Sequence, residues 1–313
     1  MSLDPDAERV LAMIAAAGRP PIQALPLHDA REGYRASRKA LTPDPPHVAH
    51  VEEVTAPVPN GSIPLRHYRG LGTSGKLPVL MFMHGGGFCI GDRDTHDYVC
   101  RKIANGAQCG VISVEYRLAP EHKFPTAIED CAAAVHWASK QAQMLGIDQQ
   151  RLAVGGDSAG GNASAVLAHM ARDGDVPRLC FQMLLYPSVE MSMRHASHRL
   201  DFSRLPLNFE AVRYFHSHYL RNPVDAADWR ASPLRARSFK GLAPAFVLTV
   251  GYDPLRDEGA EYARLLEENG VPTTFVHMSD QMHGFLTMGR IIRAADVALE
   301  LAATALKRAF ASF

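Results

Sequence analysis

A serine between closely spaced glycines is the residue best suited to chemistry in this chain. Ser158 lies in the segment Gly-Asp-Ser-Ala-Gly, residues 156–160, with a short apolar run before it and a small-residue, helix-like run after it. A G-x-S-x-G between a strand and a helix predicts a sharp turn that exposes the serine hydroxyl as a nucleophile. The alternative is a glycine-rich turn that binds a phosphate, and it is disfavoured because no lysine follows these glycines.

A serine nucleophile needs a base and a third group that orients the base. In this kind of arrangement the chain order is serine, acid, histidine. Asp253 follows the apolar run 245–250, and His283 follows the run 273–277. Because α/β enzymes keep their sites at the carboxyl ends of strands, we expect Ser158, Asp253 and His283 to meet at one edge of a sheet.

Other acids compete with Asp253 for the orienting role. Asp257 begins a helical run and is better placed as a first-turn acid. Asp280 is too near His283 in sequence for an easy bond, and Asp157 should point away from its neighbour Ser158. Asp253 therefore remains the favoured orienting residue.

Backbone donors for an oxyanion are expected in a second glycine-rich segment. His-Gly-Gly-Gly-Phe, residues 84–88, follows the apolar run 77–83, where an HGGG-type donor loop belongs in such enzymes. A further donor is expected on Ala159, directly after the nucleophile. Each donor contributes about 10²–10³-fold to turnover.

Two close histidine pairs could suggest a metal site. His195 and His198 form one pair, and His216 and His218 form the other. Both pairs fall in the expected cap without a nearby carboxylate or cysteine set, so we expect no metal and no cofactor.

The remaining pattern predicts the elements that position these residues. Strands are expected at 48–58, 63–68, 77–83, 110–114, 152–154, 179–185, 245–250 and 273–277. Helical periodicity covers 95–108, 127–145, 158–172, 258–269 and 291–310. Continuous apolar strands that alternate with helices predict an α/β fold, with an eight-stranded, mostly parallel sheet and an antiparallel hairpin turning at Asn60-Gly61.

Two regions fall outside this alternation. The N-terminal residues contain helical stretches at 7–17 and 29–40, and a long apolar insertion follows the strand that ends near residue 185. We expect both to form a helical cap over the sheet edge. The predicted divisions are 1–46 (N-terminal part of the cap), 47–188 (first part of the core), 189–230 (cap insert) and 231–313 (second part of the core).

Composition limits the remaining choices. The chain has 313 residues, 47% of them hydrophobic, and 33 basic residues balance 33 acidic ones. This argues against disorder and against a nucleic-acid partner. Five cysteines without a C-x-x-C, an acidic start and no run of about 20 apolar residues indicate reduced thiols, a cytoplasmic location and no stable membrane anchor.

Several motifs together resemble those of the bacterial hormone-sensitive lipase-like esterases, or family IV carboxylesterases, which have the α/β-hydrolase fold. The matching segments are HGGGF at 84–88, EYRLAPEHKFP at 115–125, GDSAGGN at 156–162, YDPLRDE at 252–258 and HGF at 283–285. The resemblance implies a Ser158-His283-Asp253 triad. It also implies an oxyanion hole made by the amides of Gly86, Gly87 and Ala159, with Gly85 as the next candidate.

The expected function is hydrolysis of short- to medium-chain acyl esters, small-molecule substrates, through an acyl-enzyme on Ser158. An amidase, lactonase or deacetylase would use the same triad, and a non-catalytic receptor on the same scaffold is a distant alternative. The helical run 291–310 could cover the sheet or join a homodimer. Candidates for the pocket wall, each equally suited to core packing, are Phe88, Tyr186, Phe209, Phe215, Leu255 and Phe285.

Overall fold

An eight-stranded sheet lies at the centre of the fold. The computed structural model describes residues 2–313 of the chain. The strands are β1 (His50–Val58), β2 (Gly61–Arg69), β3 (Leu77–Met83), β4 (Gly110–Val114), β5 (Ile147–Asp157), β6 (Phe181–Leu185), β7 (Ala245–Tyr252) and β8 (Thr273–Met282). Their order is β1-β2-β4-β3-β5-β6-β7-β8. Only the β1–β2 and β2–β4 pairs are antiparallel, so the predicted eight-stranded, mostly parallel sheet is confirmed.

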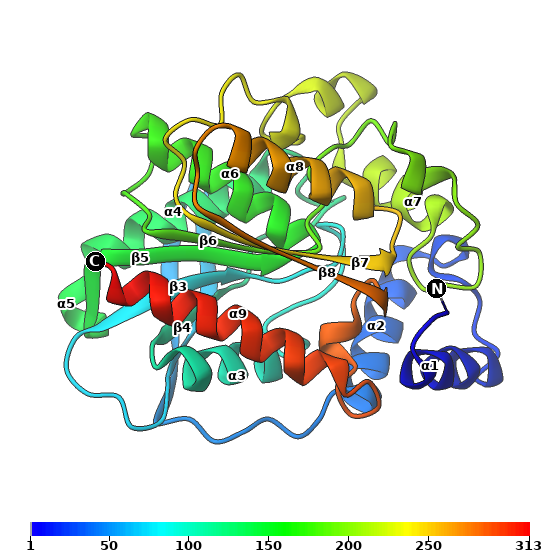
Figure 1. The fold of residues 1–313 in the computed structure, drawn as a ribbon, viewed down its shortest axis with the longest axis horizontal. Helices are drawn as coiled ribbons and strands as arrows, with labels where there is room; N and C mark the ends of the chain where they lie inside the picture. Colours follow the sequence, from blue (N-terminus) through cyan, green and yellow to red (C-terminus); the bar gives the residue numbers. More distant parts are fainter. Residues whose placement is uncertain (1) are drawn as a thin grey trace.

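Helices cover both faces of the sheet and one of its ends. The α-helices are α1 (Pro5–Ala16), α2 (Leu27–Leu41), α3 (Asp97–Ala107), α4 (Thr126–Lys140), α5 (Ala142–Leu145), α6 (Ala159–Asp173), α7 (Phe209–Tyr219), α8 (Arg256–Glu268) and α9 (Ala294–Ala311). Short 3₁₀ helices lie at Ile22–Ala24, Ala196–Arg199, Pro223–Ala227, Pro233–Arg235 and Phe285–Thr287. In Figure 1, α3 and α9 lie below the sheet, α6 and α8 lie above it, and α1, α2 and α7 gather beyond the arrowheads of β7 and β8.

The continuous apolar sequences of the central strands match their burial. Every residue of β3 and β4 is buried, as expected for apolar strands covered on both faces. At the edge, Asn60 adopts φ +63° between β1 and β2, in the turn that the Asn-Gly pair predicts. All five cysteines are buried and free of disulfides.

The largest differences from the predicted boundaries are found at three elements. β5 begins at Ile147 rather than 152, because its first half carries exposed polar residues that hide the strand pattern. The predicted helix 127–145 is divided into α4 and α5 at Gln141. β8 continues to Met282, five residues beyond its predicted end.

The N-terminal region and the insertion are in contact with each other. Asp4 caps α1 by accepting from the amides of Asp6 and Ala7, and Asn208 caps α7 in the same way. The hydroxyl of Tyr214, on α7, donates to the carbonyl of Leu25 over 3.0 Å. Both regions therefore lie over the same end of the sheet (Figure 1).

The C-terminal helix α9 covers the sheet together with α3. One face of it, which includes Ala298, Leu299 and Leu306, is buried in the core. Nowhere in residues 2–313 does a helix have the length and apolar character needed to cross a lipid bilayer.

Candidate active site

Ser158 occupies a strained turn between β5 and α6. Its φ of +56° and ψ of −117° are rare for a residue with a side chain, and α6 begins only at Ala159. The turn fits because its glycines leave room for β3. A Cβ on Gly156 or Gly160 would lie 2.2 or 1.9 Å from the carbonyl oxygen of Met83. The G-x-S-x-G spacing therefore brings the helix close to the strand and presents the serine.

Ser158, His283 and Asp253 form one hydrogen-bonded chain. Nε2 of His283 lies 2.9 Å from Oγ of Ser158, and Nδ1 lies 2.7 Å from Oδ2 of Asp253. Asp253 is fully buried, and its Oδ1 accepts from the amide of Leu255 over 2.8 Å. The ring of Tyr186 packs against the imidazole of His283, with centroids 4.6 Å apart. These contacts fix both the position of the base and the orientation of its ring.

The glycine loop after β3 is arranged beside Ser158. Gly86 and Gly87 have φ of +127° and +59°, and a Cβ would lie 2.1 Å from the Ile90 carbonyl oxygen or 2.4 Å from Cγ of Phe215. Neither amide, nor that of Ala159, donates to an acceptor within residues 2–313. All three residues line one cavity with Ser158. They are thus available as donors to a bound group.

Gly85 differs from its two neighbours. Its amide donates to Oδ1 of Asp157 over 2.9 Å, and the cavity lining does not include it. A Cβ at this position would lie 2.3 Å from Oδ2 of the same carboxylate. The expectation that Gly85 supplies an oxyanion donor is therefore at odds with its geometry.

Asp157 belongs to a buried polar set behind the glycine loop. Nε2 of His96 lies 3.2 Å from Oδ1 of Asp157, and the ring of His84 stacks on Tyr116 with centroids 4.3 Å apart. Burial raises the pKa of Asp157, but the neighbouring His96 and the Gly85 amide outweigh it and hold the pKa below its usual value. Burial also lowers the pKa of His84. Asp157, which the sequence analysis did not favour as the orienting acid, thus supports the glycine loop.

The residues of this site open into a cavity of about 760 Å³. Its wall is mostly apolar and comes from α1, α2, α7, the glycine loop and the stretch 203–208. Three predicted wall residues line it: Phe88, Phe215 and Leu255. The other three do not, because Tyr186 and Phe285 pack behind His283 and Phe209 is 39% exposed at the start of α7.

The chain is similar to known proteins over most of its length. Residues 80–287 match the α/β hydrolase fold family. The carboxylic ester hydrolase LipN of Mycobacterium tuberculosis is 41% identical over 298 residues, which cover 92% of this chain and 78% of that protein. The chain belongs to the α/β hydrolase fold family.

Further relatives narrow the branch of this family. Ethyl acetate hydrolase of Pseudomonas putida is 36% identical over 98% of this chain and 99% of its own length. The solved structure of the ester hydrolase EH1AB1 from the metagenome of Lake Arreo is 42% identical, with a TM-score of 0.95 and 99% of each chain covered. This α/β hydrolase is therefore a carboxylic ester hydrolase of the hormone-sensitive lipase-like branch, family IV.

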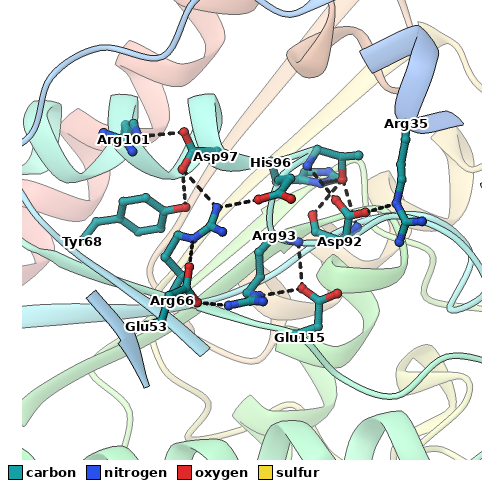
Figure 2. Close-up of polar contacts among 12 residues, drawn as sticks. Arg35, Glu53, Arg66, Tyr68, Asp92, Arg93, His96, Asp97, Arg101 and Glu115 are labelled. Atoms are coloured by element: carbon teal, nitrogen blue, oxygen red, sulfur yellow. Dashed lines mark hydrogen bonds and ion pairs between the residues drawn. The ribbon is translucent and has the colours of Figure 1, made fainter. Parts of the chain in front are cut away.

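Ion pairs that sequence reasoning missed hold the segment after the glycine loop in this α/β hydrolase. Figure 2 shows Arg35 of α2 beside Asp92, with 2.5 Å between Nε and Oδ2. Arg93 pairs with Glu115, of the EYRLAP motif, over 2.7 Å. Glu53 joins Arg93 to Arg66, and Arg66 also pairs with Asp97, which accepts from the hydroxyl of Tyr68 (Figure 2). The sequence offered two signals for these pairs, the arginines of the predicted helix 29–40 and the EYRLAP motif, and neither specifies the partners.

The expectation that His195 and His198 lack carboxylate neighbours is wrong. Nε2 of His198 lies 2.9 Å from Oε2 of Glu258, and Nε2 of His195 lies 2.9 Å from Oε2 of Glu261. One possible ligand atom each from His195, His198 and Glu258 lie within 4.8 Å of one another. Glu258 is already engaged, because its Oε1 accepts from the amide of Val189 over 2.7 Å. These contacts attach the insertion to α8.

Proposed function

We propose that this enzyme hydrolyses short- to medium-chain acyl esters through an acyl-enzyme on Ser158. The observation that carries the proposal is the contact chain from Ser158 Oγ through His283 to Asp253, at 2.9 and 2.7 Å. Such an arrangement lets a serine lose its proton as it attacks a carbonyl carbon. Ester hydrolases among the relatives add support.

The first half of the reaction uses all three residues. His283 Nε2 takes the Ser158 proton while Oγ attacks the ester carbonyl, and then gives that proton to the departing alcohol. Asp253 keeps Nδ1 protonated and stabilises the imidazolium. In the second half, water attacks the acyl-enzyme, His283 again removes a proton, and Ser158 is released with the carboxylic acid.

The tetrahedral intermediates carry a negative oxygen that needs donors. The amides of Gly86, Gly87 and Ala159 are free for this role, as described above. Gly85 is left out of the proposed set because Asp157 already accepts from its amide. Preorganised donors of this kind are usually the largest single contribution to such catalysis.

The preferred length of the substrate's acyl chain follows from the size of the cavity. The cap helices α1, α2 and α7 contribute to its wall, so the acyl chain has to fit a bounded volume of about 760 Å³. Tyr219 and Phe215 contribute aromatic surface at this wall. We therefore expect acetyl to octanoyl esters to be favoured over long-chain triglycerides.

Fluorophosphonate labelling combined with hydrolysis of a p-nitrophenyl ester series tests the proposal. Wild type should be labelled and active, whereas Ser158→Ala should lose both labelling and at least about 10⁴-fold in kcat. Ser164→Ala is the matched control, because its hydroxyl, on the same helix, donates only to the Gly160 carbonyl. Persistent hydrolysis by Ser158→Ala would overturn the mechanism.

The same experiment distinguishes the alternatives. An amidase, lactonase or deacetylase would be labelled at Ser158 but would show higher kcat/KM on an amide, lactone or N-acetyl substrate than on the matched ester. A receptor on this scaffold would bind small molecules without being labelled.

A further inference from the structure

Arg38 is a buried cation in the wall of the substrate cavity. It is 6% exposed, lies on α2, and lines the same cavity as Ser158 and His283. An arginine side chain keeps its positive charge at any pH at which the protein is folded. Burying such a charge costs free energy unless an anion or sufficient hydrogen bonds compensate for it.

The structure supplies only part of this compensation. Nη1 of Arg38 donates to Oγ1 of Thr287 over 2.7 Å, and Nε donates to Oγ of Ser37 over 3.3 Å. The guanidinium also lies over the ring of Tyr34, 4.9 Å from its centroid. Within residues 2–313, no Asp or Glu oxygen lies within 4.0 Å of Arg38, and Nη2 has no hydrogen-bond partner.

The other charges around the cavity do not neutralise Arg38. Asp157 is the only carboxylate among the lining residues, and His96 and the Gly85 amide occupy it. Two more arginines line the cavity: Arg204 pairs with Glu8, and the exposed Arg19 has no acidic partner within residues 2–313.

The histidine that α7 contributes to the wall adds no negative charge. His216 lines the cavity, and burial lowers its pKa to about 4, so it is neutral at pH 7. The cavity therefore presents an excess of positive charge to whatever enters it.

We infer that Arg38 recognises a carboxylate on the substrate, so that the preferred esters carry a second, anionic group besides the ester carbonyl. This inference rests on the proposed function, because it assigns a substrate class to the same site. The planar guanidinium offers paired donors that match a carboxylate, and a charge-assisted pair at a buried arginine is among the stronger hydrogen bonds. The carboxylate belongs to the acyl part or to the alcohol part of the ester.

Two substrate series distinguish these positions. The acyl series pairs the monoethyl esters of malonic, succinic, glutaric and adipic acid with neutral ethyl esters of equal chain length. The alcohol series pairs acetate esters of ω-hydroxy acids with acetate esters of simple alcohols. The quantity measured is kcat/KM for the carboxylated ester divided by kcat/KM for its neutral partner.

Arg38→Met should lower this ratio by about tenfold or more in one of the two series and at one preferred chain length, and Arg38→Lys should recover part of it. The matched control is Lys39→Met, which removes an equal charge from the exposed side of α2. It should leave the ratio as in wild type.

Thr287→Val separates recognition from a merely structural role of Arg38. It removes the Thr287 hydroxyl that accepts from Arg38 but keeps the guanidinium. We therefore expect kcat/KM to change equally for the two substrates of a pair. The inference is overturned if Thr287→Val lowers the ratio as much as Arg38→Met, or if Arg38→Met lowers it in neither series. Failure of the proposed function would look different, because the neutral esters would then not be hydrolysed at all.

Discussion

The amide of Gly85 donates a 2.9 Å hydrogen bond to Oδ1 of Asp157. These residues belong to two different glycine motifs, one after β3 and one after β5, and the bond fixes the donor loop relative to Ser158. Asp157 is buried and also contacts His96, so the link is charge-assisted and shielded from water. The proposed oxyanion donors are thus positioned by a side chain that takes no part in the contacts among Ser158, His283 and Asp253.

Replacing Asp157 with Asn should reduce hydrolysis without preventing substrate binding. The variant loses the charge that holds the Gly85 amide and His96, so the donor loop loses its alignment with the transition state. We expect kcat to fall about tenfold to a hundredfold and KM to change much less, corresponding to a lost charge-assisted bond of about 1.5–3 kcal/mol. Steady-state kinetics with a p-nitrophenyl ester would measure both constants.

The control for Asp157→Asn is Asp148→Asn, which removes an acid paired with Arg151 on the same strand. An unchanged kcat in Asp157→Asn would contradict the positioning role.

Replacing Gly87 with Ala should damage both stability and activity. The position has φ +59°, and the added Cβ would lie 2.4 Å from Cγ of Phe215. Backbone strain and overpacking each cost about 1–3 kcal/mol. Gly174→Ala is the control, because that glycine also has a positive φ, +87°, but open space around it. Urea unfolding and kcat should show a modest loss of stability in Gly174→Ala and a loss of both stability and activity in Gly87→Ala. Phe215→Ala should destabilise the Gly87→Ala variant less than it destabilises wild type, because it removes part of the overlap.

Replacing Asp253 with Asn should leave the fold intact but lower kcat by about 10⁴-fold, because the amide favours the wrong tautomer of His283. The control is Asp257→Asn, four residues further on, whose carboxylate pairs with Arg256. Single-turnover measurements and a thermal melt would compare them. Equal losses of activity in the two variants would argue against Asp253 as the orienting acid.

The folded protein should lose stability as the pH falls from about 6.5 to about 4. Burial lowers the pKa of His169 from 6.5 to about 4, and it lowers the pKa of His216 to about 4 as well. The unfolded chain therefore binds protons in this window that the folded chain does not, so the free energy of unfolding decreases with decreasing pH. For His169 alone the loss between pH 7 and pH 5 is roughly 2 kcal/mol.

Chemical denaturation of His169→Phe at pH 7 and pH 5 measures this contribution. The phenylalanine keeps the aromatic packing against Trp229, Phe239 and Tyr262 but cannot titrate. Its stability should depend less on pH than that of wild type by the amount given above. The exposed His28, replaced by Gln, serves as the control and should follow the wild-type profile. The same pH dependence in His169→Phe and wild type would contradict the assignment.

The sequence predicted the sheet and the candidate triad better than it predicted the surroundings of the site. Apolar runs and motif spacing are local signals, so the succession of strands along the chain could be read directly, and Ser158, Asp253 and His283 could be named as candidates that the structure places within hydrogen-bond distance of one another. The engagement of Gly85 by Asp157 could not, because it joins segments far apart in the chain. Glu258 near His198 was missed for the same reason. Six aromatic and aliphatic residues were candidates for the pocket wall. Whether each of them reaches the cavity depends on the direction of its side chain, which periodicity does not specify.

The arginines of α2 also determine how the cap can move. Arg31, Arg35 and Arg38 lie on one face of the helix, at intervals of four and three residues. Arg31 donates to the carbonyls of Cys89 and Ala119, Arg35 pairs with Asp92, and Arg38 reaches Thr287 beyond the base loop. Mechanically, α2 is therefore a fixed wall joined to the core at three sites around the nucleophile. Separation of α1 from the insertion would leave those three attachments of α2 intact and would break the Arg204–Glu8 ion pair that joins the two segments.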